Sequence, residues 1–343
     1  MEFLIIIALA GIAFYYFKKA KKTPPIQKTT KDFKIGSNYA FGKGSPGIDK
    51  LSAEVFTEQA GKGDIEAHAA LGNMYGLGIH FQKDVEQSVK HYQIASDAGH
   101  ATATYELFGC YLEGAGVPKD EQKAIELLKK AAEMGEPSAQ AVMGIFISGG
   151  VHGFTQDQTE ALHWFMKAAQ GGSAHGQLRL ADAYIAGELI QPNYEKAFEY
   201  YKKAADQDML AACERLGIFY QTDAYNEKNA AEAFKWNMKG ATLGSPKCAY
   251  FAGAALLFGD GVELNYEHAR TVLEVAAESD YADAQYLYGM MLDRALGGDR
   301  DQLKAIEWLG KSADQGNEKA LAELHQMRED IDRSLDGITG ISR

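Results

Sequence analysis

The chain has 343 residues, of which 46% are hydrophobic and only 7 are proline, a composition typical of a folded protein. Its net charge of −12 is unevenly distributed, because the first 50 residues carry nine lysines against three acidic residues and the remainder carries the acidic excess. An acidic domain repels phosphate backbones, which argues against nucleic-acid binding. Three cysteines are too few to form a disulfide framework.

An uncharged segment, Phe3 to Phe17, is followed directly by Lys18, Lys19, Lys21 and Lys22. Fifteen apolar residues form a helix of about 22 Å, shorter than the ~30 Å hydrocarbon core, and this length also fits a secretory signal. A secretory signal carries its positive charge before the apolar segment, whereas here the charge follows it. We therefore expect residues 1–17 to form an uncleaved, single-pass anchor in the inner (plasma) membrane. The positive-inside rule favours a cytoplasmic repeat domain, and a periplasmic one is the alternative.

Residues 18–50 are rich in Lys, Thr, Pro and Gly and are predicted to form a basic flexible linker. Within it, "GSNYAFGKGSPG" has some likeness to a phosphate-binding loop. The spacing does not fit, because five residues rather than four separate Gly36 from Gly42, and Gly44 stands where a Ser or Thr would hold magnesium. No nucleotide or other cofactor is predicted.

A repeat of 36 or 37 residues organises the rest of the chain. Trp164, Trp236 and Trp308 are spaced by twice 36 residues, and an alanine precedes each tryptophan by three positions. A small residue recurs at the same step in the preceding segment, at Gly72, Gly109, Gly144, Ala181, Gly217, Gly253 and Gly289. Apolar spacing and glycine-containing breaks predict two helices in each unit, with the small residue of the first helix packed against a large residue of the second.

These units resemble the Sel1-like repeat, as "ADAQYLYGMML" (282–292) and "LKAIEWLGKSADQG" (303–316) illustrate. The resemblance covers seven units over residues 64–316. It implies an all-α fold, a right-handed superhelical solenoid of antiparallel helix pairs similar to tetratricopeptide repeats. Units four and five lack the glycine-rich turn of the others, and we expect looser turns there. Residues 51–63 are predicted to be an N-terminal capping helix, and residues 317–343 a C-terminal capping helix and tail.

Catalytic and metal-binding motifs are missing from the sequence. The nine histidines show no paired-ligand spacing, and neither SxxK nor GxSxG occurs. Cys213 and Cys248 occupy positions of small packing residues, so a bridge between them is not expected. We therefore predict a protein that is not an enzyme, with no catalytic residues and no metal.

Partner binding is predicted on the first helices, because a solenoid exposes a long surface lined mostly by them. The candidate positions lie two residues before or after the repeat glycine: Leu107, Tyr111, Val142, Phe146, Arg179, Arg215, Phe219 and Phe251. Arg179 and Arg215 are equivalent residues one repeat apart, suited to a carboxylate. The alternative is that the apolar members pack between repeats and that the arginines pair with nearby acids.

The resemblance implies a membrane-anchored, non-catalytic scaffold or adaptor that binds a protein or peptide in the solenoid groove. Such a protein would help to assemble, localise or regulate an envelope complex, such as a secretion system or a signalling machine. Two alternatives remain open at this point. One is an envelope-acting hydrolase or β-lactam-binding enzyme, and the other is a periplasmic cell-wall or contact sensor.

Overall fold

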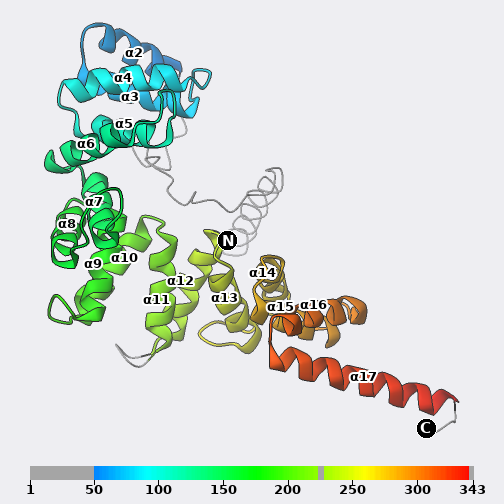
Figure 1. Cartoon of the computed structure of the whole chain (residues 1–343). Coiled ribbons are helices and arrows are strands. Elements are labelled where there is room, and N and C mark those ends of the chain that lie inside the picture. The colour runs from blue at the N-terminus through cyan, green and yellow to red at the C-terminus, as the bar shows by residue number, and fades with distance from the viewer. Residues whose placement is uncertain (1–49, 223–227, 340–343) are drawn as a thin grey trace. The chain divides into compact units, whose positions relative to one another are not determined.

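The computed structural model describes residues 50–222 and 228–339, which form sixteen α-helices and no strands (Figure 1). The expected all-α class is confirmed for this part of the chain. None of the helices in these ranges is long and apolar enough to cross a bilayer. The predicted anchor, residues 1–17, lies outside the described residues, as does the predicted linker up to residue 49.

The chain divides between Asn193 and Tyr194 into two compact units, which we describe separately. The first unit contains α2 (Lys50–Gly61), α3 (Ile65–Leu77), α4 (Val85–Asp97), α5 (Ala101–Glu113), α6 (Glu121–Glu133), α7 (Pro137–Gly149), α8 (Gln158–Gln170) and α9 (Ala174–Ala186). The second contains α10 (Tyr194–Asp206), α11 (Leu210–Gln221), α12 (Ala230–Thr242), α13 (Pro246–Phe258), α14 (Tyr266–Glu278), α15 (Ala282–Asp293), α16 (Gln302–Asp314) and α17 (Glu318–Thr339).

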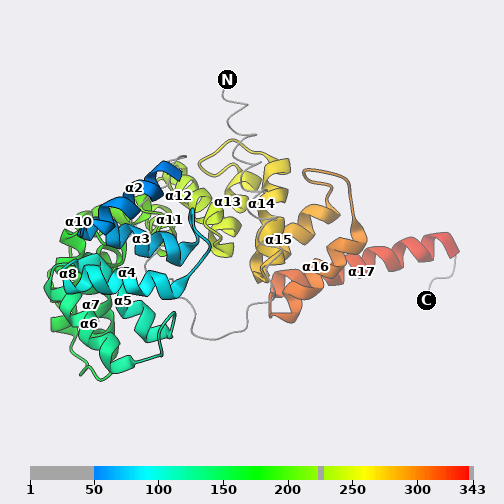
Figure 2. The same cartoon turned by 90° about the horizontal axis from the view of Figure 1, so that it is seen from above.

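Within each unit, successive helices pack side by side as pairs (Figures 1 and 2). Six of the seven first helices pack on the second helix of their own repeat, as α3 does on α4 and α13 on α14. In the remaining repeat, α9 and α10 belong to different units. First helices of neighbouring repeats also touch one another, for example α3 with α5 and α13 with α15. A residue on a first helix therefore has neighbours on three sides, and only part of the helix surface remains open.

Side-chain caps fix where the second helices begin. The caps are Asp or Asn residues whose side-chain oxygen accepts a hydrogen bond from a backbone N–H two or three residues further on. They are Asp84, Asp120, Asp157, Asn229, Asn265 and Asp301.

Most first helices end at a glycine in the left-handed region, the C-terminal conformation that glycine adopts without steric cost. These glycines are Gly78, Gly114, Gly150, Gly187 and Gly259.

The repeat glycines pack directly against the second helix. A Cβ atom added to Gly144 would lie 2.5 Å from ring atom Cε1 of Phe165, and one added to Gly72 would lie 2.5 Å from Cδ1 of Tyr92. The predicted packing of a small residue against a large one is confirmed at these positions. The turn of the fifth repeat, where a looser conformation is expected, lies largely outside the described residues.

Helices α2 and α17 pack on α3 and α16, the first and last helices of the repeat region. Ala53 and Ala60 of α2 are buried with Leu71 of α3, and Ala320 and Met327 of α17 are buried in the core of the second unit. The capping role of these two helices stays a prediction.

Candidate functional site

Four of the eight predicted binding residues are buried. Leu107, Val142, Phe146 and Phe219 belong to the apolar core and have at most 6% of their surface exposed. These side chains pack between helices, as the packing alternative anticipates, and they do not form a surface on which a partner can dock.

The other four predicted residues are partly or fully exposed. Tyr111 is covered on one side by Lys123, whose Nζ lies 4.2 Å from the ring centroid and donates a 2.6 Å hydrogen bond to Oη. Phe251 lies beside Tyr250, with ring centroids 5.0 Å apart. Arg179 belongs to the first unit and Arg215 to the second, so their combined carboxylate site remains a prediction.

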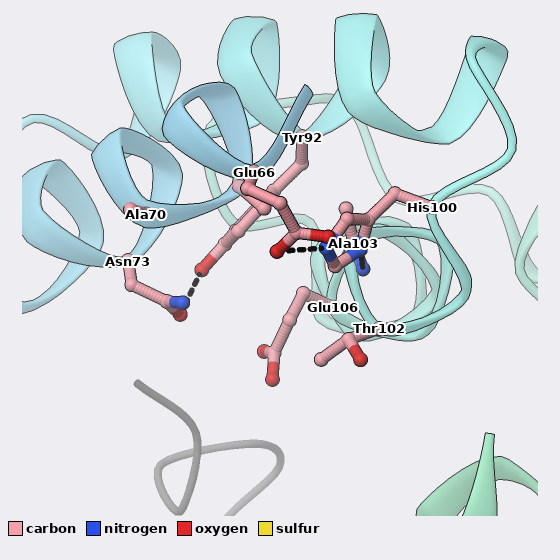
Figure 3. A pocket seen from close by; sticks show the side chains of 9 residues that line it. Glu66, Ala70, Asn73, Tyr92, His100, Thr102, Ala103 and Glu106 are labelled. Atoms are coloured by element: carbon pink, nitrogen blue, oxygen red, sulfur yellow. Dashed lines mark hydrogen bonds and ion pairs between the residues drawn. The ribbon is translucent and has the colours of Figure 1, made fainter. Parts of the chain in front are cut away.

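A pocket of about 420 Å³ lies between α3, α4 and α5 of the first unit (Figure 3). Figure 3 shows Glu66 and Asn73 extending from α3, and Thr102 and Glu106 from α5, around this pocket. Its lining residues are Glu66, Ala69, Ala70, Asn73, Tyr92, His100, Thr102, Ala103 and Glu106. Three of these residues are alanines, whose small side chains leave the space open. None of the described residues that line the pocket is a lysine or an arginine.

Asn73 places a hydrogen-bond donor in the pocket. Its side chain is only 8% exposed, and its Oδ1 accepts a 2.7 Å hydrogen bond from the Tyr92 hydroxyl. Burial raises the pKa of Tyr92 far above its usual range, so that hydroxyl stays protonated and keeps donating. Within the described residues, the Asn73 amide nitrogen has no acceptor, and it is open to the pocket rather than sealed in the core.

Glu106 places an acceptor in the same pocket. Its carboxyl group is partly buried and makes no hydrogen bond or ion pair with any described residue. Burial, and secondarily the negative charge of Glu136, raises the pKa of Glu106 to about 8. At neutral pH this carboxyl is therefore mostly protonated and uncharged, and it ionises when a positive charge approaches.

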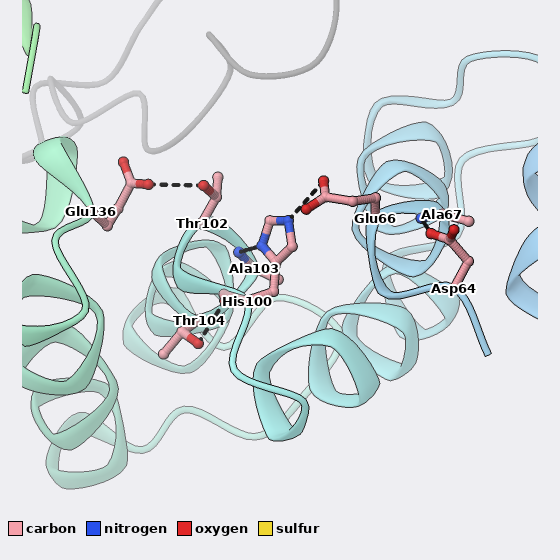
Figure 4. Close-up of polar contacts among 8 residues, drawn as sticks. All are labelled: Asp64, Glu66, Ala67, His100, Thr102, Ala103, Thr104 and Glu136. Carbon is pink, nitrogen blue, oxygen red and sulfur yellow. Dashed lines mark hydrogen bonds and ion pairs between the residues drawn. The ribbon is translucent and has the colours of Figure 1, made fainter.

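Glu136 is held in place by the helix that it caps. It is 3% exposed, its Oε1 accepts from the backbone N–H of Ser138, and its Oε2 accepts a 2.8 Å hydrogen bond from Thr102 (Figure 4). These contacts fix the carboxylate near Glu106 without neutralising it. An acidic N-cap stabilises the start of α7 and at the same time makes the neighbouring pocket more negative.

His100 does not neutralise the pocket either. Its Nδ1 accepts a 3.0 Å hydrogen bond from the backbone N–H of Ala103, so the proton of the neutral ring is on Nε2. Nε2 then donates to Oε2 of Glu66 at 3.2 Å (Figure 4). In this arrangement the imidazole is uncharged and positions the Glu66 carboxylate at the rim.

The corresponding position in the second unit provides an internal comparison. Glu214 and Glu106 both lie three residues before the glycine of their repeat. Glu214 accepts a 2.5 Å hydrogen bond from the hydroxyl of Ser245, which caps the next first helix. In the first unit, the first helix that follows the repeat of Glu106 is α7, and its capping residue is the acidic Glu136. One glutamate is thus matched by a donor, and the other faces a second carboxylate.

The second unit offers apolar and aromatic surface on its first helices. The rings of Tyr250 and Tyr281 lie 5.3 Å apart, and both are partly exposed. A smaller pocket of about 180 Å³ lies between α12 and α13. Phe234, Phe251 and Phe258 line it together with alanines and with polar residues such as Asn237 and Asp260. Such recesses accept apolar side chains of a bound polypeptide.

Metal or thiol chemistry finds no support in the described part of the chain. No group of three or more His, Cys, Asp or Glu side chains there could hold a metal ion. Cys213 and Cys248 are buried and free, and burial raises the pKa of each thiol to about 11. Both thiols are therefore protonated, and unreactive, at neutral pH.

Sequence reasoning missed Asn73, Glu106 and Glu136. A comparison of the repeats with one another contains a signal that could have found them. The position of Glu106 is occupied by Ala69 and Ala141 in the flanking repeats, so an acid there stands out. The Asp and Asn caps of the second helices were also not predicted, although they recur four residues before the small residue of each second helix.

Comparisons with known proteins agree with the repeated helix pairs of this fold. The chain is 26% identical over 270 residues to Chitin synthase regulatory factor 3 of Schizosaccharomyces pombe, a match that covers 76% of this chain and 29% of that protein. This chain thus spans less than a third of that relative's length.

Two solved structures are also similar. One is a protective antigen present in uropathogenic Escherichia coli strains, which displays an SLR fold; it is 33% identical with a TM-score of 0.66, and the match covers 80% of this chain and 59% of that one. The other is a Sel1 repeat protein from Oxalobacter formigenes, 28% identical with a TM-score of 0.55 and coverage of 82% and 83%.

The family model described as "Sel1 repeat" matches seven consecutive segments, 65–100, 101–136, 137–173, 174–209, 210–245, 246–281 and 282–317. These segments confirm the seven repeats predicted from the sequence. They cover far more than half of the chain and coincide with its helix pairs. The chain belongs to the Sel1 repeat family.

Proposed function

We propose that this chain is a membrane-attached, non-catalytic adaptor whose repeats bind a partner protein through the first helices. One observation carries the proposal: first helices of both units line a recess. In the first unit the recess contains the Asn73 amide and Glu106, and in the second it lies beside Phe251. Within each unit, such recesses suit a segment of another polypeptide.

Membrane attachment is part of the proposal. Its support is the apolar segment Phe3–Phe17 and the lysines that follow it, which favour a single span in the inner (plasma) membrane with the repeats on the cytoplasmic side. The acidic repeat domain then recruits its partner to the membrane surface through a basic linker of about thirty residues. Fully extended, such a linker reaches on the order of 100 Å.

The partner complex is proposed to be an assembly of the cell envelope, such as a secretion system or a signalling machine. The support is analogy. The similar protein from Schizosaccharomyces pombe is by its name a regulatory factor of chitin synthase, which fits a regulatory rather than a catalytic role.

Site-specific photo-cross-linking in intact membranes tests the proposal. A photoreactive amino acid replaces either Tyr111 or Phe251 on first helices, and Met166 or Ile94 on second helices serves as the matched control, since both controls are exposed. We expect one discrete partner to be cross-linked from the first helices and not from the second. Cross-links confined to the second helices, or none from any site, would contradict the proposal.

A further inference from the structure

The pocket between α3 and α5 of the first unit combines an unmatched acceptor with an unmatched donor. Glu106 has no hydrogen-bond partner among the described residues, and neither does the amide nitrogen of the largely buried Asn73. Both groups reach solvent, because Trp236 Nε1 is the only buried side-chain nitrogen or oxygen without a hydrogen-bond partner in the described part of the chain. A ligand that pairs both groups therefore replaces water at two positions that the fold leaves open. The pocket therefore has the character of a binding site rather than of a packing defect.

The charge of the pocket selects the ligand. Glu66 and Glu106 line it, Glu136 lies close enough to raise the pKa of Glu106, and His100 is neutral because Nδ1 accepts a backbone hydrogen bond. A group with positive charge and N–H donors complements this set of oxygens. A bare metal ion does not, since no described side chains converge as a metal site.

The size of the pocket fits an amino-acid side chain. A volume of about 420 Å³ exceeds what a single ion or water molecule needs and lies within the range of small ligand sites. Ala69, Ala70 and Ala103 provide an apolar wall for an aliphatic stem, and the Asn73 amide nitrogen can donate to a main-chain carbonyl beside the charged group.

We propose that this pocket binds a cationic group of a partner polypeptide, either a lysine or arginine side chain or an amino terminus. The inference rests on the proposed adaptor function and adds the chemistry that the first unit recognises. Binding pairs Glu106 with the cation, and the carboxyl proton is released to solvent.

Calorimetry on the purified full chain tests this inference. Four pentapeptides serve as probes: acetylated peptides with a central lysine, arginine or norleucine, and the norleucine peptide with a free amino terminus. We expect at least one cationic peptide to bind about tenfold more tightly than the acetylated norleucine peptide. The cationic peptide that binds best identifies the source of the charge.

Two variants isolate the pocket. Glu106→Gln keeps the shape of the side chain but cannot ionise, and it should remove the preference for cationic peptides. Glu214→Gln, at the equivalent position that Ser245 already satisfies, should retain it. Measurements at pH 7 in two buffers of different ionisation enthalpy should detect proton release on binding to the native chain, and none with Glu106→Gln.

If none of the three cationic peptides binds more tightly than the acetylated norleucine peptide, the inference is overturned, and a preference that survives Glu106→Gln would overturn it as well. If first-helix cross-links persist in that case, only the pocket assignment fails. If the cross-links are missing as well, the proposed function fails with it.

Discussion

Glu106 and Glu214 occupy the same position in their repeats, yet only Glu214 receives a hydrogen bond from a described side chain, the Ser245 hydroxyl. The difference comes from the residue that caps the following first helix, which is Glu136 in one case and Ser245 in the other. A single capping position thus decides whether the neighbouring glutamate is satisfied within the fold or left for a ligand.

The first prediction concerns the pH dependence of stability. Glu106 has a pKa raised to about 8 in the folded chain, well above the value of an unfolded glutamate, so folding favours its protonated form. Its stabilising contribution is complete at acidic pH and is lost as the pH rises toward and through 8. Glu106→Gln should therefore raise the melting temperature at pH 9 more than at pH 5, as measured by circular dichroism.

Glu214→Gln is the control for that experiment. Its carboxylate accepts the Ser245 hydrogen bond, so the substitution should give no comparable gain at pH 9. An equal pH-dependent gain in both variants would show that the effect arises from net charge rather than from the environment of Glu106.

The second prediction concerns ligand affinity. Affinity for the lysine or arginine peptide should rise between pH 6 and pH 9, because Glu106 must ionise to pair with a ligand that stays charged over this range. Glu66, Glu136 and His100 are the neighbouring groups that can carry charge. Tyr92, Tyr105 and Cys110 also interact electrostatically with Glu106, and their raised pKa values keep them neutral over this range. Glu106→Gln should flatten the profile, and a slope that persists in this variant would implicate one of the other groups.

The third prediction concerns the repeat glycines. A methyl group at Gly144 would lie 2.5 Å from the Phe165 ring, so Gly144→Ala must displace α7 from α8. Overpacking of this kind costs about 1–3 kcal/mol of unfolding free energy in chemical denaturation. Gly310→Ala is the control, because nothing lies within 4 Å of its added Cβ. It lies inside α16 and should be neutral or stabilise by up to about 1 kcal/mol.

The fourth prediction concerns the caps of the second helices. The Asp157 carboxylate accepts hydrogen bonds from the backbone N–H groups of Thr159 and Glu160. Asp157→Ala should reduce the free energy of unfolding by about 1 kcal/mol. Asp157→Asn should keep most of this stabilisation, because its side-chain oxygen can still accept the hydrogen bonds. If both variants lose the same amount, the contribution comes from charge at the helix terminus and not from the hydrogen bonds.

Much of the fold could be predicted because the repeats pack a small residue of their first helix against a large residue of their second. The pairing of Gly72 with Tyr92 and of Gly144 with Phe165 follows from residue size and a constant step. Binding positions could not be assigned in this way. Leu107 and Val142 are buried because each first helix has neighbours on three sides, which a helical spacing alone does not specify. The pocket depends on a coincidence of alanines beside Asn73 and Glu106, and no periodic rule encodes it.

Hydrogen–deuterium exchange tests the central claim, that the first helices bind the partner, most directly. Exchange would be measured on the full chain alone and with the partner identified by cross-linking. We predict slower exchange in α3 and α5, and in α13 and α15, with little change in the paired helices α4 and α14. Slower exchange confined to the second helices would show that the partner binds there instead.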